Sequence, residues 1–582
     1  MSVPRSVRPV RRTAVLTAAA LAGLGLVASS ATAASPASKP RPGDVEIQLL
    51  AVNDYHGHLE ATTPGKVGEV AAGGSEYLAT HLERLRVGHR NSVTVAAGDL
   101  IGGTPFLSGL FHDEPSVESL NAMKLDVASV GNHEFDEGVT ELLRMQNGGC
   151  HAEGCYFEGQ PYPGADFQWL AANVKNAQNE TPLPPYEIKK FQGAEVAFIG
   201  MTLEGTAALV AQSGIEGWRF DDEVETANAL VPELRRKGVE AMVVLLHEGG
   251  AQTGTFNECK GISGPVVEIA QKLDPEIDAV ITGHTHQAYN CVIDDPAGEP
   301  RRVTSAFSFG RVISEINLTI DRTTKDVRRD AVSATNHVVT QDVPKAAAQT
   351  AIIERWSALA DEVGNRQVGT IAADIRRQYE AGGSDNRGAE SDLGNMIADA
   401  QLAATRVNGA QLALMNPGGL RADLLYAQSR EEGDGVVTYR EAFDVQPFGN
   451  LLSTIPMTGD QLRRVLEQQC QSRYLHLGVS EGFTYDIVRE LNGRVCTPGS
   501  IEVTNMQLDG VPIDMNATYM VTVNNFLADG GDNFTVFREV PASARIGAGE
   551  DLDALIAYLG AQPNLAPPGT DRVNELALVA AG

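Results

Sequence analysis

Short, strongly apolar segments recur through the first half of the chain, and each of them ends in polar residues. They span residues 45–49, 92–96, 126–130, 241–246 and 277–281. Their short length and their content of Val and Ile predict strands that are largely buried. In a layered α/β domain, the loops that leave the carboxyl ends of such strands meet in a common crevice. The pattern therefore predicts an α/β domain with its functional residues at one edge.

The residues that follow these segments are of the kinds that bind metal ions. They are Asp54, His56, Asp99, Asn132, His247, His284 and His286. A glycine precedes Asp99, Asn132 and His284, where it allows a sharp turn and a close approach of the backbone to an ion. Nitrogen and oxygen donors without thiolate suit zinc, manganese or another first-row ion, whereas calcium sites contain few imidazoles.

The second half of the chain lacks such clusters and contains residues suited to a nucleotide. Arg387 and Arg421 suit bidentate contacts with phosphate. Phe448 and Phe526 lie beside Gly and Asn residues and suit stacking on a planar base. Taken alone, two such Phe residues are more often part of a hydrophobic core.

The order of these motifs resembles that of a known family. Asp-x-His, Gly-Asp, Gly-Asn-His-Glu, His and Gly-His-x-His follow one another as in the calcineurin-like metallophosphoesterases. Asn-Asp-Tyr-His-Gly-His at 53–58 and Gly-Asn-His-Glu-Phe-Asp at 131–136 resemble the secreted 5′-nucleotidase family within that group. The resemblance implies a four-layer α/β/β/α metallophosphoesterase domain, followed by an α+β nucleotide-binding C-terminal domain.

The resemblance also implies roles for individual residues. One divalent metal ion is expected at Asp54, His56 and His286, a second at Asn132, His247 and His284, with Asp99 bridging both. Two such ions can generate hydroxide from a shared water at neutral pH. His133 is expected to contact the phosphate and to stabilise the transition state, and Asp136 to orient its imidazole and keep it protonated. An N-cap is the alternative role for Asp136.

In the C-terminal half, the resemblance rests on the segments around Asn416, Phe448 and Phe526. It implies that Phe448 and Phe526 sandwich the base. The other substrate-binding residues expected are Arg387, Asn416, Arg421, Asn450 and Asp532, with Asn450 at the base edge, Asp532 on the ribose, and both Arg residues on the phosphate side.

The domain organisation follows from changes in composition along the chain. Residues 1–33 combine four Arg with an apolar run and small residues, which predicts an export signal. We expect a catalytic domain at 44–341, a linker helix and hinge at 342–366 and a substrate-binding domain at 367–579. Within the linker, Pro344 precedes a helical pattern over 345–363 that Gly364 closes. Relatives rotate their C-terminal domain, and Gly364 is the expected pivot.

Charge and cysteine content narrow the function further. The chain has 582 residues and a formal net charge of −29, which argues against binding to nucleic acid polymers. No later apolar stretch is long enough to span a membrane. All six Cys follow the signal segment and fall into sequence-local couples, so we expect disulfides 150–155, 259–291 and 470–496.

These observations favour a secreted phosphoric monoester hydrolase of the 5′-nucleotidase type, with two divalent metal ions, zinc or manganese, and a nucleotide substrate. Alternatives on the same metal core are a 2′,3′-cyclic nucleotide phosphodiesterase with 3′-nucleotidase activity and a UDP-sugar hydrolase. A nucleotide-binding surface protein without turnover is the alternative outside enzymes. The sequence leaves base preference and oligomeric state open.

Overall fold

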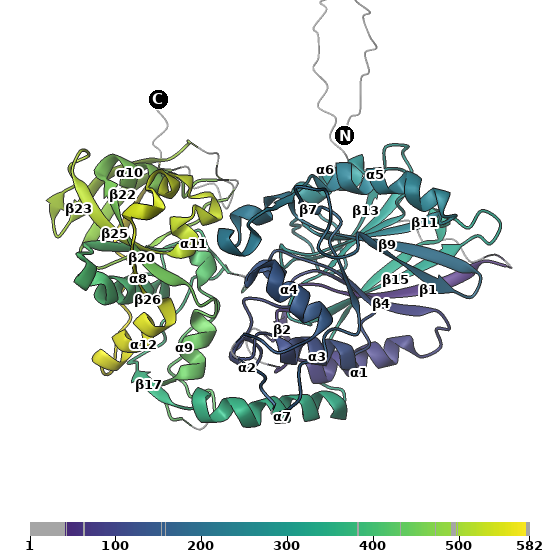
Figure 1. Ribbon diagram of the computed structural model, residues 1–582, viewed down its shortest axis with the longest axis horizontal. Helices are drawn as coiled ribbons and strands as arrows, with labels where there is room; N and C mark the ends of the chain where they lie inside the picture. Colours follow the sequence, from purple (N-terminus) through teal and green to yellow (C-terminus); the bar gives the residue numbers. More distant parts are fainter. Residues whose placement is uncertain are drawn as a thin grey trace, which may run out of the picture.

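The computed structural model describes residues 41–577 apart from 42, 62–64, 153, 158, 381–382, 384, 431, 472, 490–495 and 497–498. The expected signal segment at 1–33 lies outside these residues. Figure 1 shows two lobes, an N-terminal one in purple to teal and a C-terminal one in green to yellow, with helix α7 (Ala347–Gly364) running along the base of both. Within the described residues, every helix is too short or too polar to cross a bilayer.

Two six-stranded sheets form the centre of the N-terminal lobe. The first has the order β16 (Ser333–Val338), β15 (Val312–Ile320), β1 (Val45–Val52), β4 (Ser92–Ala97), β5 (Val127–Ser129), β6 (Gln168–Leu170). The second has the order β13 (Ala288–Asp294), β14 (Pro300–Ala306), β12 (Ala279–Thr282), β11 (Ala241–His247), β9 (Ala194–Thr202), β8 (Tyr186–Phe191). β1, β4, β5 and β6 pair in parallel, as do β9, β11, β12 and β14. The five strands predicted from the apolar segments are all present.

The two sheets pack face to face and helices cover their outer faces. Leu49 and Val95 of the first sheet share a buried core with Phe198, Val243 and Ile281 of the second. The helices α1 (Ser75–Arg86), α3 (Glu114–Ala122) and α4 (Gly138–Asn147) enclose a second core outside the first sheet. The helices α5 (Glu223–Arg236) and α6 (Pro265–Lys272) enclose a third outside the second sheet. The predicted four-layer α/β/β/α arrangement is therefore confirmed.

Helix α7 links the lobes and begins and ends within two residues of the predicted helix. Its buried residues Ile352, Trp356 and Ala360 pack against Phe106 and Phe111 of the N-terminal lobe. Shorter elements of that lobe are β2 (Lys66–Val67), β3 (Val70–Ala71), α2 (Phe106–Gly109), β7 (Val174–Asn176) and β10 (Trp218–Phe220).

The C-terminal lobe is a mixture of sheets and helices, as expected. A five-stranded sheet has the order β21 (Gly478–Val479), β18 (Leu412–Met415), β25 (Thr518–Asn524), β20 (Leu451–Thr458), β26 (Ile546–Glu550). A four-stranded sheet has the order β24 (Val511–Pro512), β23 (Glu502–Leu508), β22 (Phe483–Arg489), β27 (Val573–Ala577), and β17 (Gln367–Thr370) pairs with β19 (Val436–Thr438). The helices are α8 (Asp392–Thr405), α9 (Tyr439–Val445), α10 (Gly459–Glu467), α11 (Asn525–Ala528) and α12 (Asp551–Ala561).

Local signals explain where two of these helices begin. Thr438 and Thr458 each accept a hydrogen bond from the backbone N–H three residues later, and Glu441 and Gln461 bond back, so α9 and α10 both start with a capping box. All three predicted disulfides are present, joining Cys150 to Cys155, Cys259 to Cys291 and Cys470 to Cys496.

Candidate metal centre

The carboxyl ends of five strands from both sheets meet at one site. Potential ligand atoms of Asp54, His56 and His286 lie within 4.8 Å of one another, and the same holds for Asp99, His247 and His284. The first group is connected to the second through His56, whose Nε2 atom lies 3.6 Å from Oδ2 of Asp99. The structure thus brings the sequence-predicted ligands into two adjacent groups.

In the first group, Asp54 is held rigidly. Its side chain is fully buried and accepts hydrogen bonds from the Asn53 amide at 2.6 Å and from the backbone N–H of His284 at 3.0 Å. Nε2 of His286 lies 3.3 Å from Oδ1 of Asp54. Asn53, to which the sequence analysis assigned no role, also bonds to the backbone of Ala306 and Phe307 and so fixes the loop that carries Asp54.

In the second group, Asp99 has the central position. Its Oδ2 atom lies 2.9 Å from Nε2 of His247, and its Oδ1 atom accepts a hydrogen bond of 2.9 Å from the backbone N–H of His133. Oδ1 of Asn132 lies 3.0 Å from Nδ1 of His284. Asn132 thus joins this group, as the motif order predicted.

The orientation of two imidazoles fits bound cations. Nδ1 of His56 lies 2.7 Å from the carbonyl oxygen of Gly102, and Nδ1 of His247 lies 2.8 Å from that of Ala97. A hydrogen bond to a carbonyl fixes the tautomer and turns the Nε2 lone pair inward, as in most metal-binding histidines. Nε2 of His56 is buried without a hydrogen-bond partner, which is costly unless a cation is bound, and Nε2 of His247 points at the Asp99 carboxylate. The residues therefore fit a two-metal centre.

The three glycines act mainly by allowing close approach. A Cβ atom on Gly131 would lie 2.2 Å from Oδ1 of Asp99, and one on Gly98 would lie 2.5 Å from Nδ1 of His247. A Cβ atom on Gly283 would lie 2.6 Å from the carbonyl oxygen of Ala97. Only Gly98 among them has a positive φ, of 78°. The predicted sharp turn is therefore found at Gly98, and at the other two the requirement is space.

The ligand-bearing loops carry unusual backbone strain. Positive φ angles of 46° to 68° occur at five non-glycine residues of the centre: Asp54, His56, Asp99, His284 and His286. Such conformations cost about 1–3 kcal/mol each and persist only where the surrounding structure enforces them. The two-sheet scaffold therefore enforces these conformations of the ligand-bearing loops.

His133 and Asp136 form the predicted pair beside the centre. Nδ1 of His133 lies 2.7 Å from Oδ2 of Asp136. Burial lowers the pKa of His133, but the charges of Asp136 and Asp99 outweigh burial and raise the pKa above its usual value. Asp136 does not cap α4, whose N-cap residue is Glu137.

Glu134 is a functional residue that the sequence analysis missed. Its buried carboxylate accepts hydrogen bonds from the backbone N–H groups of Asp99 at 3.0 Å, Leu100 at 2.7 Å and Gly131 at 2.5 Å. It therefore ties the loop after β4 to the loop after β5. Its position as the acidic residue of the Gly-Asn-His-Glu motif was the feature of the sequence that could have indicated this role.

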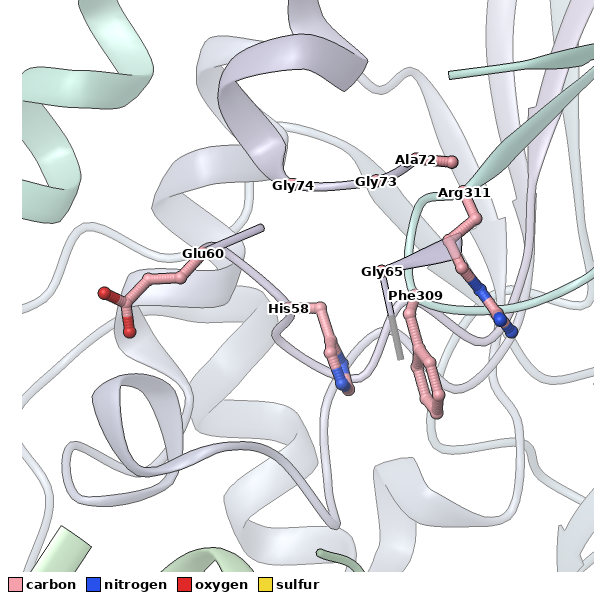
Figure 2. Close-up of a pocket in the computed structure, with 8 residues that line it drawn as sticks. All are labelled: His58, Glu60, Gly65, Ala72, Gly73, Gly74, Phe309 and Arg311. Atoms are coloured by element: carbon pink, nitrogen blue, oxygen red, sulfur yellow. The ribbon is translucent and has the colours of Figure 1, made fainter. Parts of the chain in front are cut away.

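The second histidine of the first motif, His58, does not join the metal groups. It lines a small pocket with Phe309 and Arg311, in which its ring stacks on Phe309 with centroids 3.9 Å apart (Figure 2). Burial lowers the pKa of His58 to about 3, so the ring is neutral at physiological pH. Its Nδ1 atom lies 2.8 Å from the carbonyl oxygen of His56, so His58 supports the turn that carries His56.

Two of the sequence-predicted residues of the C-terminal lobe lie next to the centre. The ring of Phe448 stacks on the ring of His133, and the Arg421 guanidinium lies over Phe448, 5.7 Å from the ring centroid. A Cβ atom on Gly103 would lie 3.1 Å from Phe448 and 3.2 Å from Arg421. Burial lowers the pKa of Arg421 to about 10, with a further contribution from the nearby Arg387, and the group remains charged at neutral pH.

The other predicted residues form two further groups. Nδ2 of Asn416 donates to Asp532 at 3.1 Å, and a Cβ atom on the neighbouring Gly418 would lie 3.4 Å from Asp532 and 3.6 Å from Arg387. Nδ2 of Asn450, the residue before β20, donates to Asp551 at the start of α12 at 3.3 Å, and α11, which carries Phe526, packs against β20. The structure therefore collects Arg387, Asn416 and Asp532. Asn450 and Phe526 flank a second point, where the backbone N–H of Leu451 donates to the side chain of Asn525 at 3.1 Å.

Arg377, to which the sequence analysis assigned no role, also lies near Arg421. It donates hydrogen bonds to Asp423 and Asp385 at 3.1 Å and to the Tyr379 hydroxyl at 2.8 Å. Two carboxylates thus neutralise the charge of Arg377. Its role is therefore to support the segments around Arg421.

Comparison with known proteins agrees with this geometry. The calcineurin-like phosphoesterase pattern matches residues 47–288, and the 5′-nucleotidase C-terminal domain pattern matches residues 367–539. A crystal structure of a 5′-nucleotidase precursor from Thermus thermophilus superimposes with a TM-score of 0.74 at 24% identity, over 91% of this chain and 99% of that one, which shows the shared fold.

Two bacterial relatives are closer in sequence. The chain is 33% identical to the endonuclease YhcR of Bacillus subtilis, over 88% of this chain and 40% of that protein. It is 32% identical to the cell wall protein Lmo0130 of Listeria monocytogenes, over 88% of this chain and 67% of that protein. The chain thus spans less than half of the first relative and about two thirds of the second. With both domains matched in order, the chain belongs to the 5′-nucleotidase family of calcineurin-like metallophosphoesterases.

Proposed function

We propose that the protein is a secreted, metal-dependent 5′-nucleotidase that hydrolyses nucleoside 5′-monophosphates to nucleoside and phosphate. One observation carries this proposal: the two metal-binding groups and the His133–Asp136 pair face Arg421 and Phe448 of the other lobe. A phosphate held at the metal-binding groups would therefore lie within reach of a buried cation and an aromatic ring. That combination suits a phosphorylated molecule with a planar base.

In this proposal the first ion is held by Asp54, His56 and His286, the second by Asn132, His247 and His284, and Asp99 is shared. The ions, zinc or manganese, would supply Lewis acidity toward the phosphate and a nucleophile at neutral pH.

The chain's own residues orient the substrate and move the proton. Arg421 binds a phosphate oxygen through charge-assisted hydrogen bonds. Because Asp136 occupies Nδ1 of His133, the Nε2 atom is available to donate a proton to the departing 5′ oxygen. Arg387 assists on the phosphate side, Asp532 and Asn416 bind the ribose region, and Phe448 and Phe526 with Asn450 bind the base.

Because the net charge of −29 repels anions, an anionic substrate can bind only at this local arrangement of cations. This favours small nucleotides over nucleic acid polymers. The three disulfides support folding in an oxidising compartment, and hence secretion. Cyclic nucleotides and UDP-sugars remain alternative substrates of the same centre. Because one relative is an endonuclease, the assay must also include nucleic acid as a substrate.

The test is chromatographic analysis of the products that mature protein forms from AMP, ATP, a UDP-sugar, 2′,3′-cyclic AMP and single-stranded DNA, together with phosphate release from AMP. Each reaction is repeated after chelation and after adding back zinc or manganese. We expect metal-dependent hydrolysis that is fastest with AMP, abolished in Asp99→Ala and reduced about 10- to 100-fold in kcat/KM in Arg421→Ala. Arg376→Ala removes an exposed Arg that pairs with Asp374 and is the matched control. Metal-loaded protein that is inactive on AMP would overturn the proposal.

A further inference from the structure

A third group of metal-binding side chains lies apart from the centre described above. It consists of His112, Glu137 and His151. Nδ1 of His112 lies 2.9 Å and 2.8 Å from the two carboxylate oxygens of Glu137, and Nε2 of His151 lies 3.9 Å from one of them. The potential ligand atoms all lie within 4.8 Å of one another. None of these residues belongs to the nucleotidase motifs.

Three separate segments contribute to this group. His112 lies in the turn between α2 and α3, where its φ of 46° is followed by a φ of 62° at Asp113. Glu137 is the N-cap residue of α4. His151 lies beside the Cys150–Cys155 disulfide. Because distant segments are brought together by the fold, the arrangement is not a local accident of sequence.

The two imidazoles lie close to each other and to the Glu137 carboxylate, so a small turn of either ring would direct a nitrogen of each toward one cation. Their rings stack with centroids 3.6 Å apart and planes inclined by 26°. Two protonated rings at this distance would repel each other. A divalent ion uses both rings in their neutral form together with the carboxylate. Two imidazoles and one carboxylate are a common ligand set of zinc sites that keep a water in the fourth position.

The surroundings provide both a rigid wall and an entry path. Tyr156 lies 6.3 Å from the His112 ring, and Phe111, which precedes His112, packs on Tyr156 and on Trp356 of α7. The side chains of His112 and His151 are mostly covered, whereas that of Glu137 is 45% exposed. An ion and its water ligand can therefore arrive from the solvent side.

We propose that His112, Glu137 and His151 bind a third divalent metal ion of the zinc class, distinct from the two of the catalytic centre. The site joins segments that support the active site. Glu137 follows Asp136, and the Asp113 carboxylate next to His112 accepts hydrogen bonds from the Gly102 N–H at 2.9 Å and the Ser108 hydroxyl at 2.6 Å. A metal ion bound here would join the segments of His112, Glu137 and His151. The segment of His112 contacts the loop whose Gly102 carbonyl oxygen holds His56.

The test counts metal ions without using turnover. Metal-depleted full-length mature protein is equilibrated with zinc, freed of unbound metal by gel filtration and analysed by mass spectrometry for zinc per chain. We expect His112→Gln/His151→Gln to bind one zinc fewer than wild type. The matched control is His89→Gln/His337→Gln, since these two histidines also flank a single carboxylate, Glu315, at 3.9 Å and 2.9 Å but do not form a three-ligand group. The control is expected to match wild type.

A second variant tests the proposal in case the double histidine variant does not fold. Glu137→Gln keeps the size of an exposed side chain and removes only the anionic ligand. We expect the weakest of the zinc-binding steps, resolved by competition with a chromogenic chelator, to weaken at least about 10-fold. Equal zinc content and affinity in wild type and Glu137→Gln would overturn the proposal, and the histidine pairs would then be ordinary hydrogen-bonded side chains. Because only a difference in zinc content is measured, the outcome does not depend on nucleotidase activity.

Discussion

The ring of Phe448 in the C-terminal lobe stacks on the ring of His133 in the N-terminal lobe, with centroids 5.9 Å apart and planes inclined by 19°. The contact joins the residue proposed to hold the base to the residue proposed to protonate the leaving group. Under the proposed function, Phe448 would have two separable functions, namely stacking on a base and shielding His133 from water.

Substitution of Phe448 separates these functions. If Phe448 stacks on the base, Phe448→Leu should lower kcat/KM for AMP by about 10- to 100-fold, because base–aromatic stacking contributes about 1–3 kcal/mol. Ribose 5-phosphate, which lacks a base, should be hydrolysed by the variant as well as by wild type. Equal losses on both substrates would instead assign Phe448 to the shielding of His133.

The hydrogen bond between His133 and Asp136 predicts a defect confined to catalysis. Asp136→Asn keeps the shape of the side chain but removes the charge that stabilises the protonated imidazole. We expect kcat for AMP to fall about 10- to 100-fold with little change in KM or metal content. Asp166→Asn, the same change at an exposed carboxylate, should leave kcat as in wild type. A fall in metal content matching the fall in kcat would show that Asp136 acts on the metal centre.

Glu134 predicts a structural effect on the same loops. Glu134→Gln would place an amide N–H₂ against backbone N–H groups that now donate to a carboxylate. Leaving buried donors unsatisfied costs about 1–3 kcal/mol, so thermal unfolding should begin at lower temperature and zinc should dissociate faster. Unfolding and zinc dissociation at wild-type values would show that the hydrogen bond to the oxygen replaced by the amide nitrogen is dispensable.

Asp444 predicts a pH-dependent contact between the lobes. It lies on α9, and its carboxylate accepts a hydrogen bond of 2.6 Å from the backbone N–H of Phe106. Burial raises the pKa of Asp444 to about 7; the Phe106 hydrogen bond and Arg440 oppose this shift, and Glu60 and Glu441 add to it. In separated lobes the carboxyl would titrate near 3.9.

The sign of the effect follows from proton binding. Between about pH 4 and pH 7 the contacting state binds a proton that the separated state has released, so contact weakens as the pH rises through this window and is weakest above about pH 7. Small-angle scattering should show a larger mean radius at pH 7.5 than at pH 5. Asp444→Asn should flatten this dependence, whereas the exposed Asp553→Asn should preserve it. An unchanged pH dependence in Asp444→Asn would exclude Asp444 as its source.

A cross-link between the lobes tests whether turnover requires them to move. Arg430 of the C-terminal lobe forms an ion pair of 2.9 Å with Glu60 of the N-terminal lobe, and Gly364 at the end of α7 is the proposed pivot. Glu60→Cys/Arg430→Cys, joined by a short bifunctional thiol reagent, should lose most turnover while still binding nucleotide. The uncross-linked double variant is the control. Full turnover after cross-linking would contradict the rotation.

The sequence predicted the strands because each is a short, strongly apolar run, and it predicted the linker helix because a helical pattern lies between Pro344 and Gly364. Residues 241–246 became β11, and the pattern over 345–363 became α7. Without the resemblance, the apolar pattern could not assign the strands to sheets, since β4 and β11 have similar runs yet belong to different sheets. Sheet membership depends on packing between distant segments, which local periodicity does not encode.

The same limit applies to the site. The metal-binding residues follow strands and stand in recognisable motifs, so their types and order were informative. Glu134 was missed because its function is to accept backbone hydrogen bonds. Many polar residues can do this, so the residue type alone does not indicate the function. His112 and His151 were assigned no role because their partner Glu137 lies on a different segment, and only the folded chain places the three together.

The wide sequence separation of the ligands constrains when the centre can form. Asp54 and His284, which share a hydrogen bond, are 230 residues apart, and they come from different sheets. A nascent chain therefore has no complete centre until the loop after β12, which carries His284 and His286, has been synthesised and the sheets have packed. Truncated chains ending before that strand would be metal-free, and the ions present where folding finishes would determine which metals the protein first acquires.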